Sequence, residues 1–119
     1  MTKTTATLWI YLATFWFGMS IYGLFLQIPS AQPPPFIHMD KVAHWGLFFG
    51  QFYLLGQVCF YKNGRIAYGK LLLLALIWAV SSELIQGYFT NRTMDRWDAT
   101  ADMCGAICAL GLLRLKTNV

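Results

Sequence analysis

Residues 8–28 read LWIYLATFWFGMSIYGLFLQI, a run of 21 residues that holds no charged side chain and one amide, Gln27. A helix rises about 1.5 Å per residue, so a run of this length matches a hydrocarbon core of roughly 30 Å. The apolar core of a cleaved signal peptide is shorter, about 7–15 residues. We therefore predict an uncleaved membrane-spanning helix.

Three further apolar runs follow, separated by segments that interrupt helices. The run Pro33–Pro35 lacks backbone donors and cannot lie inside a helix, and residues 62–65 form a polar turn with Gly64 as the helix stop. We predict no strands in these runs, because lipid cannot form hydrogen bonds with the backbone groups at an open sheet edge. We predict a single all-α domain over residues 1–119, an integral membrane bundle of four transmembrane helices at about residues 8–28, 42–61, 66–89 and 97–115.

The composition agrees with a chain that faces lipid. Hydrophobic residues make up 57% and charged residues 12%, whereas soluble domains have roughly 45–50% and about 25%. An ordinary water-soluble domain is therefore excluded. The formal net charge of +4 comes from nine basic residues that are scattered among apolar runs and form no patch, so we predict no nucleic-acid partner.

The distribution of charge along the chain predicts the orientation. With a cytoplasmic amino terminus, six of the nine basic residues face the cytoplasm and all five acids lie on the outer side. Cytoplasmic loops of membrane proteins are enriched in Lys and Arg. We predict that both termini are cytoplasmic and that the outer half holds the functional groups.

The outer ends of the second and third runs carry two polar patches. Asp40 and His44 are spaced i, i+4 on one face, where Asp40 is also suited to cap the helix. Glu83 and Gln86 share a face of the third helix, where a lipid-facing carboxylate costs about 2.5–3.5 kcal/mol. Glu83 should therefore face the bundle interior, as part of a functional site or of a buried hydrogen-bond network.

A third patch spans residues 91–102. Asp95, Asp98 and Asp102 are spaced to share one helix face, and either Arg92 or His44 is expected to pair with them unless one acid keeps its proton. Asp95 and Asp98 are also compatible with acids that offset a helix dipole. Asp102 lies too deep for that role.

The three cysteines lie inside apolar runs and are odd in number. Cys104 and Cys108 are one helical turn apart without a histidine at ligand spacing. We expect Cys59, Cys104 and Cys108 to act as buried small hydrophobes.

The polar motifs resemble a known family. Asp-Lys-x-x-His over residues 40–44, Glu-x-x-Gln over 83–86 and Arg-x-x-Asp-x-x-Asp over 92–98, with a polar residue four further on and then a glycine, resemble the VanZ-like membrane proteins. That family is named for an accessory teicoplanin-resistance protein. The resemblance implies a bacterial inner-membrane protein of the cell envelope. It makes these residues the family's polar positions: Asp40, Lys41, His44, Glu83, Gln86, Arg92, Asp95 and Asp98.

We consider three hypotheses for the function. The first is an outer-face polar pocket that binds an envelope lipid, a lipid-linked cell-wall precursor or a glycopeptide antibiotic, with Arg92 pairing with its phosphate or carboxylate. The second is a metal-assisted or acid–base enzyme on a lipid-linked phosphate, in which His44 oriented by Asp40 is the base and Asp98 and Asp102 hold a divalent cation or share the acid–base work. The third is a transporter that works as a homo-oligomer, because four short helices enclose no solute path.

These hypotheses assign the polar residues as follows. The binding hypothesis needs no cofactor and no metal, and a divalent cation enters only with the enzyme hypothesis. Membrane lipids are the expected partners in all three. Candidates for catalysis are His44, Asp40, Glu83, Asp98 and Asp102, and candidates for ligand binding are Lys41, Gln86, Arg92 and Asp95.

Overall fold

The computed structural model describes residues 3–23, 39–89 and 96–117, and within these ranges the chain is all-α, with four helices and no strand. Both boundaries of each of the last three helices were predicted within three residues. The first helix begins five residues earlier than expected, and residues 24–38 lie outside the described ranges. The helices are α1 (Lys3–Ile21), α2 (Met39–Asn63), α3 (Tyr68–Phe89) and α4 (Arg96–Thr117).

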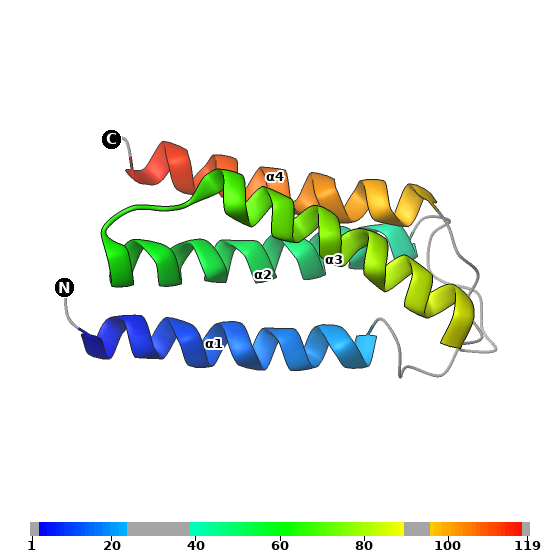
Figure 1. Cartoon of the computed structure of the whole chain (residues 1–119), viewed down its shortest axis with the longest axis horizontal. Helices are drawn as coiled ribbons and strands as arrows, with labels where there is room; N and C mark the ends of the chain where they lie inside the picture. Colours follow the sequence, from blue (N-terminus) through cyan, green and yellow to red (C-terminus); the bar gives the residue numbers. More distant parts are fainter. Residues whose placement is uncertain (1–2, 24–38, 90–95, 118–119) are drawn as a thin grey trace.

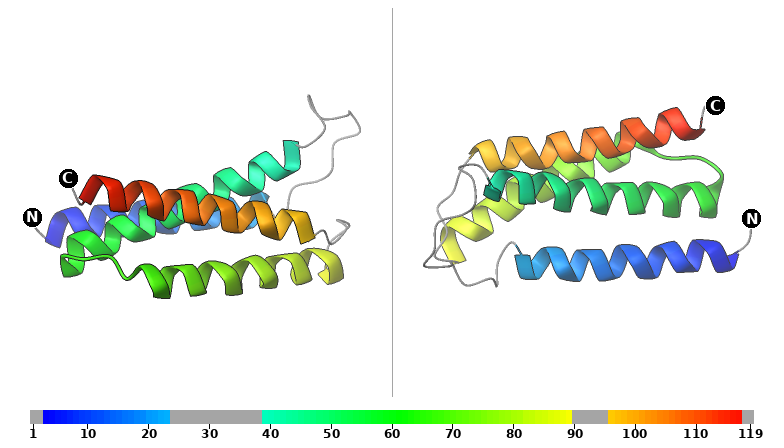
Figure 2. Two further views of the ribbon diagram at one scale, coloured as in Figure 1. Left: turned by 90° about the horizontal axis from the view of Figure 1, so that it is seen from above. Right: turned by 180° about the vertical axis from the view of Figure 1, so that it is seen from behind.

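The four helices lie lengthwise beside one another, with α2 between α1 and α4 (Figure 1). α3 crosses one side of the α2–α4 pair and packs mainly against α4, and a second view shows it as a separate layer (Figure 2). The amino end of α1, the carboxyl end of α4 and the α2–α3 connection share one end of the bundle. The start of α2, the end of α3 and the start of α4 therefore share the opposite end.

The turn between α2 and α3 follows the predicted stop signal. α2 ends at Asn63, and Gly64 has a φ of +78°, a left-handed conformation that glycine adopts without steric cost. The Gly64 amide donates to the carbonyl of Phe60 at 2.9 Å. The chain thus reverses within a few residues.

The interface between α2 and α4 forms most of the core. A Cβ atom at Gly105 would overlap the carbonyl oxygen of Trp45, and one at Gly56 would overlap the side chain of Leu113. Glycine at these points lets the two helices approach closely, as small residues do between membrane helices. The buried apolar residues around this interface are Phe48, Phe52, Leu71, Ala75, Ala79, Ala106, Ala109, Leu110 and Leu113.

Helix α1 is attached to α2 by two side-chain hydrogen bonds to backbone carbonyls. The indole of Trp16 donates to Leu47 at 2.8 Å, and the amide of Gln51 donates to Ala13 at 3.3 Å. Gly50 leaves room for the Trp16 ring, because a Cβ there would overlap it. Sequence reasoning treated α1 as a uniform apolar span and did not find these contacts.

The outer surface of the bundle is rich in large apolar side chains. α3 alone exposes Leu73, Leu74, Leu76, Ile77, Val80 and Leu84. Among the described residues α3 is the one helix both long and apolar enough to cross a membrane, and Thr5–Ile21 is apolar but shorter. α2 and α4 also bury polar side chains that lower their mean hydropathy: His44, Gln51 and Gln57 in α2, and Asp98 and Asp102 in α4.

The prediction for the cysteines is wrong at two positions. Cys104 and Cys108 are exposed on the outer face of α4, and Cys59 is half-buried. All three are free thiols. Because the run is apolar on several sides, the sequence did not indicate which face of α4 meets the other helices.

Candidate functional site

Buried ionisable side chains from three helices converge at the end of the bundle opposite the termini. α2 contributes His44 near its start, α3 contributes Glu83 near its end, and α4 contributes Asp98 and Asp102 near its start. Their exposed fractions are 2%, 7%, 6% and 0%, respectively. Together with Lys41 we call these residues the charged cluster.

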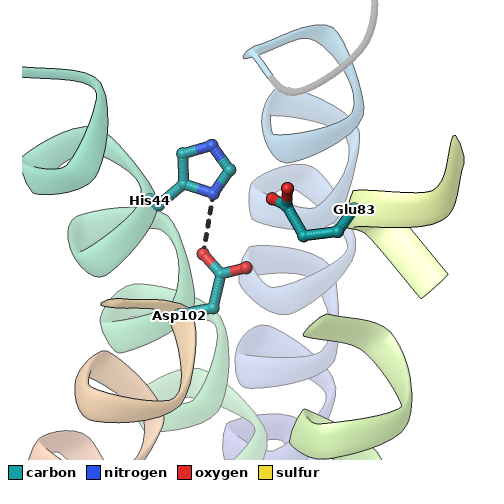
Figure 3. A group of neighbouring side chains, drawn as sticks. All are labelled: His44, Glu83 and Asp102. Atoms are coloured by element: carbon teal, nitrogen blue, oxygen red, sulfur yellow. Dashed lines mark hydrogen bonds and ion pairs between the residues drawn. The ribbon is translucent and has the colours of Figure 1, made fainter. Parts of the chain in front are cut away.

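The shortest contact in the charged cluster joins α2 to α4. His44 Nδ1 lies 2.8 Å from Asp102 Oδ1, and a hydrogen bond connects them (Figure 3). Neither side chain meets solvent, so a low local dielectric strengthens this bond. Asp102, predicted to lie too deep to offset the helix dipole, is thus the inner partner of the histidine.

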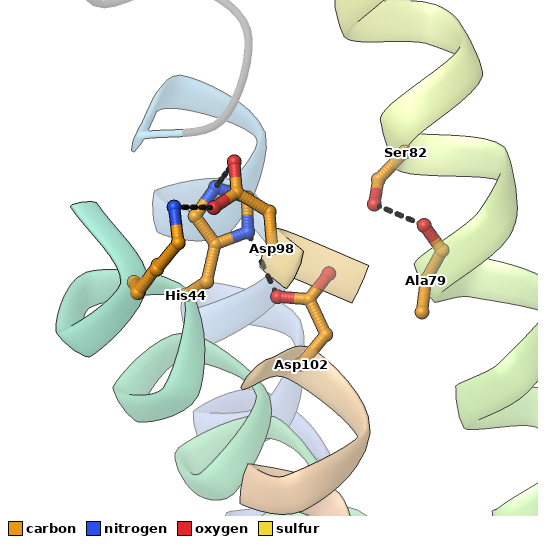
Figure 4. Close-up of polar contacts among 6 residues, drawn as sticks. His44, Ala79, Ser82, Asp98 and Asp102 are labelled. Carbon is orange, nitrogen blue, oxygen red and sulfur yellow. Dashed lines mark hydrogen bonds and ion pairs between the residues drawn. The ribbon is translucent and has the colours of Figure 1, made fainter. Parts of the chain in front are cut away.

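Asp98 links the buried histidine to the edge of the bundle. Its Oδ1 accepts a hydrogen bond from Lys41 Nζ at 3.2 Å, and its Oδ2 lies 3.7 Å from His44 Nε2 (Figure 4). The Lys41 side chain is 26% exposed, whereas that of Asp98 is 8% exposed. A continuous series of ionisable groups therefore runs from the surface at Lys41 to the interior at Asp102.

The buried polar residues of helix α3 all lie near the charged cluster. Ser82, Glu83 and Gln86 are buried, and Glu83 and Gln86 share a face as predicted. The Glu83 carboxylate points toward His44 and Asp102 (Figure 3). The hydroxyl of Ser82 instead donates to the carbonyl of Ala79 at 2.9 Å, which explains its burial (Figure 4).

The charged cluster contains more acid than base. It holds three carboxylates against Lys41 and one histidine. Within the described ranges, His44 Nε2 and Asp102 Oδ2 are buried and have no hydrogen-bond partner. A buried polar atom without a hydrogen-bond partner raises the free energy of the folded state. A bound ion or ligand is one explanation for such an atom.

Three residues of the cluster have the chemistry and the spacing of metal ligands. His44, Glu83 and Asp102 each offer one ligand atom, and these atoms lie within 4.8 Å of one another. The residues predicted from the sequence to hold a cation were Asp98 and Asp102, and Glu83 was not among them. The signal was that His44 and Glu83 both lie one to two turns inside the same end of the bundle.

A largely apolar groove of about 390 Å³ lies between α1, α2 and α3. Its lining includes Phe17, Phe52, Leu55, Leu74 and Trp78, with Gln51 as a polar member. Trp78 is about one turn before Ser82 and Glu83 on α3. The groove therefore lies along the middle of the bundle, and along α3 it ends about one and a half turns before Glu83.

Not every predicted site residue is described. The structure joins Lys41, His44, Asp98 and Asp102 directly and turns Glu83 toward them, while Gln86 is buried on the same face of α3. The predicted shared face of α4 is therefore confirmed for Asp98 and Asp102. Asp40 lies in the first turn of α2, with its side chain outside the described part of the structure, and Arg92 and Asp95 lie outside the described residues.

Comparisons with known proteins found no relative of this chain. No family model, curated protein or solved structure matches the chain.

Proposed function

We propose that the chain is a four-span protein of the bacterial inner membrane with both termini cytoplasmic. The exposed apolar side chains around the bundle support this, because a soluble monomer rarely presents so much contiguous apolar surface. Charge is also sorted along the bundle axis. The acids Glu83, Asp98 and Asp102 lie at the end opposite the termini. Exposed basic residues lie at the end that holds the termini, namely Lys62, Arg65, Lys70, Arg114 and Lys116.

The charged cluster, in this proposal, binds the polar head of an envelope amphiphile: an envelope lipid, a lipid-linked cell-wall precursor or a glycopeptide. The observation that carries the proposal is the burial of four ionisable side chains from three helices at one end of the bundle. Buried charges of this kind contribute little net stability and mark functional sites in membrane proteins. Lys41, at the edge of the cluster, is placed to meet a phosphate or carboxylate.

The apolar groove is the proposed site for the hydrocarbon chain of the same amphiphile. It opens among α1, α2 and α3, beside exposed apolar residues, and its lining residue Trp78 precedes Glu83 of the cluster by five residues on α3. An amphiphile needs a polar site for its head and a neighbouring apolar site for its hydrocarbon chain. The two features together favour a lipid-like ligand over a small polar solute.

Native mass spectrometry of the detergent-purified protein tests this function. The probes are phosphatidylethanolamine, phosphatidylglycerol, a polyprenyl phosphate and teicoplanin, each at equal concentration. We expect one probe to bind at least about 10-fold more tightly than the others, and Asp98→Asn or Leu74→Trp to weaken it by about 10-fold. Lys70→Gln, at the opposite end, is the matched control and should bind normally.

Equal binding of all four probes to the wild-type protein and to both variants would contradict the proposal. Fractionation of expressing bacteria tests the location separately. The protein should remain in the inner-membrane fraction after an alkaline wash. Recovery in the soluble fraction would contradict the four-span arrangement even if a probe bound.

A further inference from the structure

We propose that His44, Glu83 and Asp102 form a binding site for one divalent transition-metal cation. The ion would join α2, α3 and α4 at the end of the bundle that carries the charged cluster. This inference goes beyond the proposed function, because it rests on the geometry of three side chains and does not depend on which amphiphile is bound.

The spacing of the ligand atoms suits a single ion. Ligands at about 2.1 Å from an octahedral ion lie about 3 Å apart when adjacent and about 4.2 Å apart when opposite. His44 Nδ1 and Asp102 Oδ1 are 2.8 Å apart, the separation of adjacent ligands. All three ligand atoms lie within 4.8 Å of one another, so a side-chain movement of about 1 Å closes the site.

A second observation points independently to a ligand. Asp102 is fully buried, and its Oδ2 has no hydrogen-bond partner within the described part of the chain. In Figure 3 this oxygen is turned toward the side where the Glu83 carboxylate lies. A cation between the two carboxylates would satisfy the Asp102 oxygen and explain why it is buried there.

Asp98 and Lys41 hold the His44 ring in position without being ligands of the ion. A metal-bound imidazole normally donates its second ring N–H to a carboxylate, which fixes the tautomer and orients the ring. With His44 Nδ1 on the ion, Nε2 carries the proton and faces Asp98 Oδ2 at 3.7 Å. Lys41 holds the other oxygen of Asp98 at 3.2 Å, so Asp98 is a positioning residue.

The charge of the cluster also fits a divalent cation. Three carboxylates face one lysine among the described residues of the cluster, and a neutral histidine adds no charge. An ion of charge +2 would bring the sum to zero. In a surrounding of low dielectric a neutral set of groups costs far less than an acidic one.

The donor set selects the class of ion. One imidazole nitrogen with carboxylate oxygens and no thiolate suits Mn²⁺ or Zn²⁺, whereas Mg²⁺ and Ca²⁺ take oxygen ligands almost exclusively. The free cysteines are not ligands, because Cys104 and Cys108 are exposed on the outer face of α4. We therefore use Mn²⁺, which is paramagnetic, as the probe.

The test measures Mn²⁺ binding to the detergent-purified full chain after treatment with EDTA. Electron paramagnetic resonance titration should show one bound Mn²⁺ per chain, and pulsed spectra should show coupling to an imidazole nitrogen. Glu83→Gln and Asp102→Asn should each weaken binding by at least about 100-fold, and Asp98→Asn by about 10-fold. Ser82→Ala, a buried polar substitution beside Glu83, is the matched control and should bind Mn²⁺ normally.

Two results would overturn the proposal. One is the absence of imidazole nitrogen coupling in the wild-type protein at saturating Mn²⁺, a measurement that needs no variant to fold. The other is unchanged Mn²⁺ affinity in Glu83→Gln or Asp102→Asn with a wild-type circular dichroism spectrum. Competition by Mg²⁺ at equal concentration would contradict the assigned class of ion.

Discussion

The interface between α2 and α4 consists of two regions that differ in chemistry. In the middle of the bundle, Phe52, Ala109 and Leu113 are packed in an apolar core. At the end of the bundle opposite the termini, the same two helices place His44 against Asp102. Gly105, one turn beyond Asp102, lies beside the backbone of Trp45 and keeps the helices close at the boundary between the two regions.

This difference separates stability from function. The apolar region stabilises the bundle through close packing, which is a main force between helices in lipid. The charged region adds one strong hydrogen bond but also buries several ionisable groups, so its net contribution to stability is small. In our two proposals the role of the charged region is binding, and the following predictions test this division between stability and binding.

The largest effect is expected for Gly105→Leu. Its side chain would overlap the carbonyl oxygen of Trp45, a backbone atom that moves only if α2 and α4 separate. We expect a loss of about 3 kcal/mol or more in the free energy of unfolding, measured by circular dichroism in detergent. Gly111→Leu is the matched control, since a Cβ there meets no atom within 4 Å. Equal stability of the two variants would show that the close approach is not needed.

Phe52→Ala tests the apolar region alone. Phe52 is 1% exposed and packs against Phe48, so its truncation leaves a cavity. We expect a loss of about 3 kcal/mol in the free energy of unfolding and unchanged Mn²⁺ binding in the protein that remains folded. Leu73→Ala, at an exposed position of α3 outside the groove, serves as control and should lose less than about 0.5 kcal/mol. Loss of Mn²⁺ binding by folded Phe52→Ala would mean that the two regions are coupled.

Asp102→Leu tests the charged region alone. It leaves the buried His44 ring without this hydrogen-bond partner, for which we expect a loss of about 2 kcal/mol. The double variant His44→Leu/Asp102→Leu should regain most of that stability, because an apolar pair replaces a buried polar pair with little or no penalty. Thermal unfolding of the three proteins measures this. A double variant less stable than the single one would indicate that the pair itself holds the helices together.

Lys41→Gln should have the smallest effect on folding. The Lys41–Asp98 pair is partly exposed, so its loss should lower the free energy of unfolding by about 0.5 kcal/mol. Mn²⁺ binding should nevertheless weaken several-fold, because Asp98 loses the group that holds it beside His44. Titration of Mn²⁺ at equal fractions of folded protein checks this. A large loss of stability with normal Mn²⁺ binding would reverse the division drawn above.

The order of the four helices and most of the charged cluster follow from the sequence. Apolar runs of span length separated by proline or a polar turn predicted the helices, and Gly64 marked the end of α2. The spacing of Asp98 and Asp102 predicted a shared face, and the cost of a carboxylate in an apolar run predicted that Glu83 faces inward. These inferences need only local periodicity and the physics of a buried charge.

The tertiary structure decided which of these groups meet. A helix that is apolar on nearly all sides carries no signal for its packing face, which is why the exposure of Cys104 and Cys108 was not predicted. The convergence of His44, Glu83 and Asp102 depends on how three helices cross, and the crossing is set by contacts far apart in sequence, such as Gly105 with Trp45. The sequence therefore determined which residues are polar and how deep they lie, whereas helix packing alone determined that three of them form a common site.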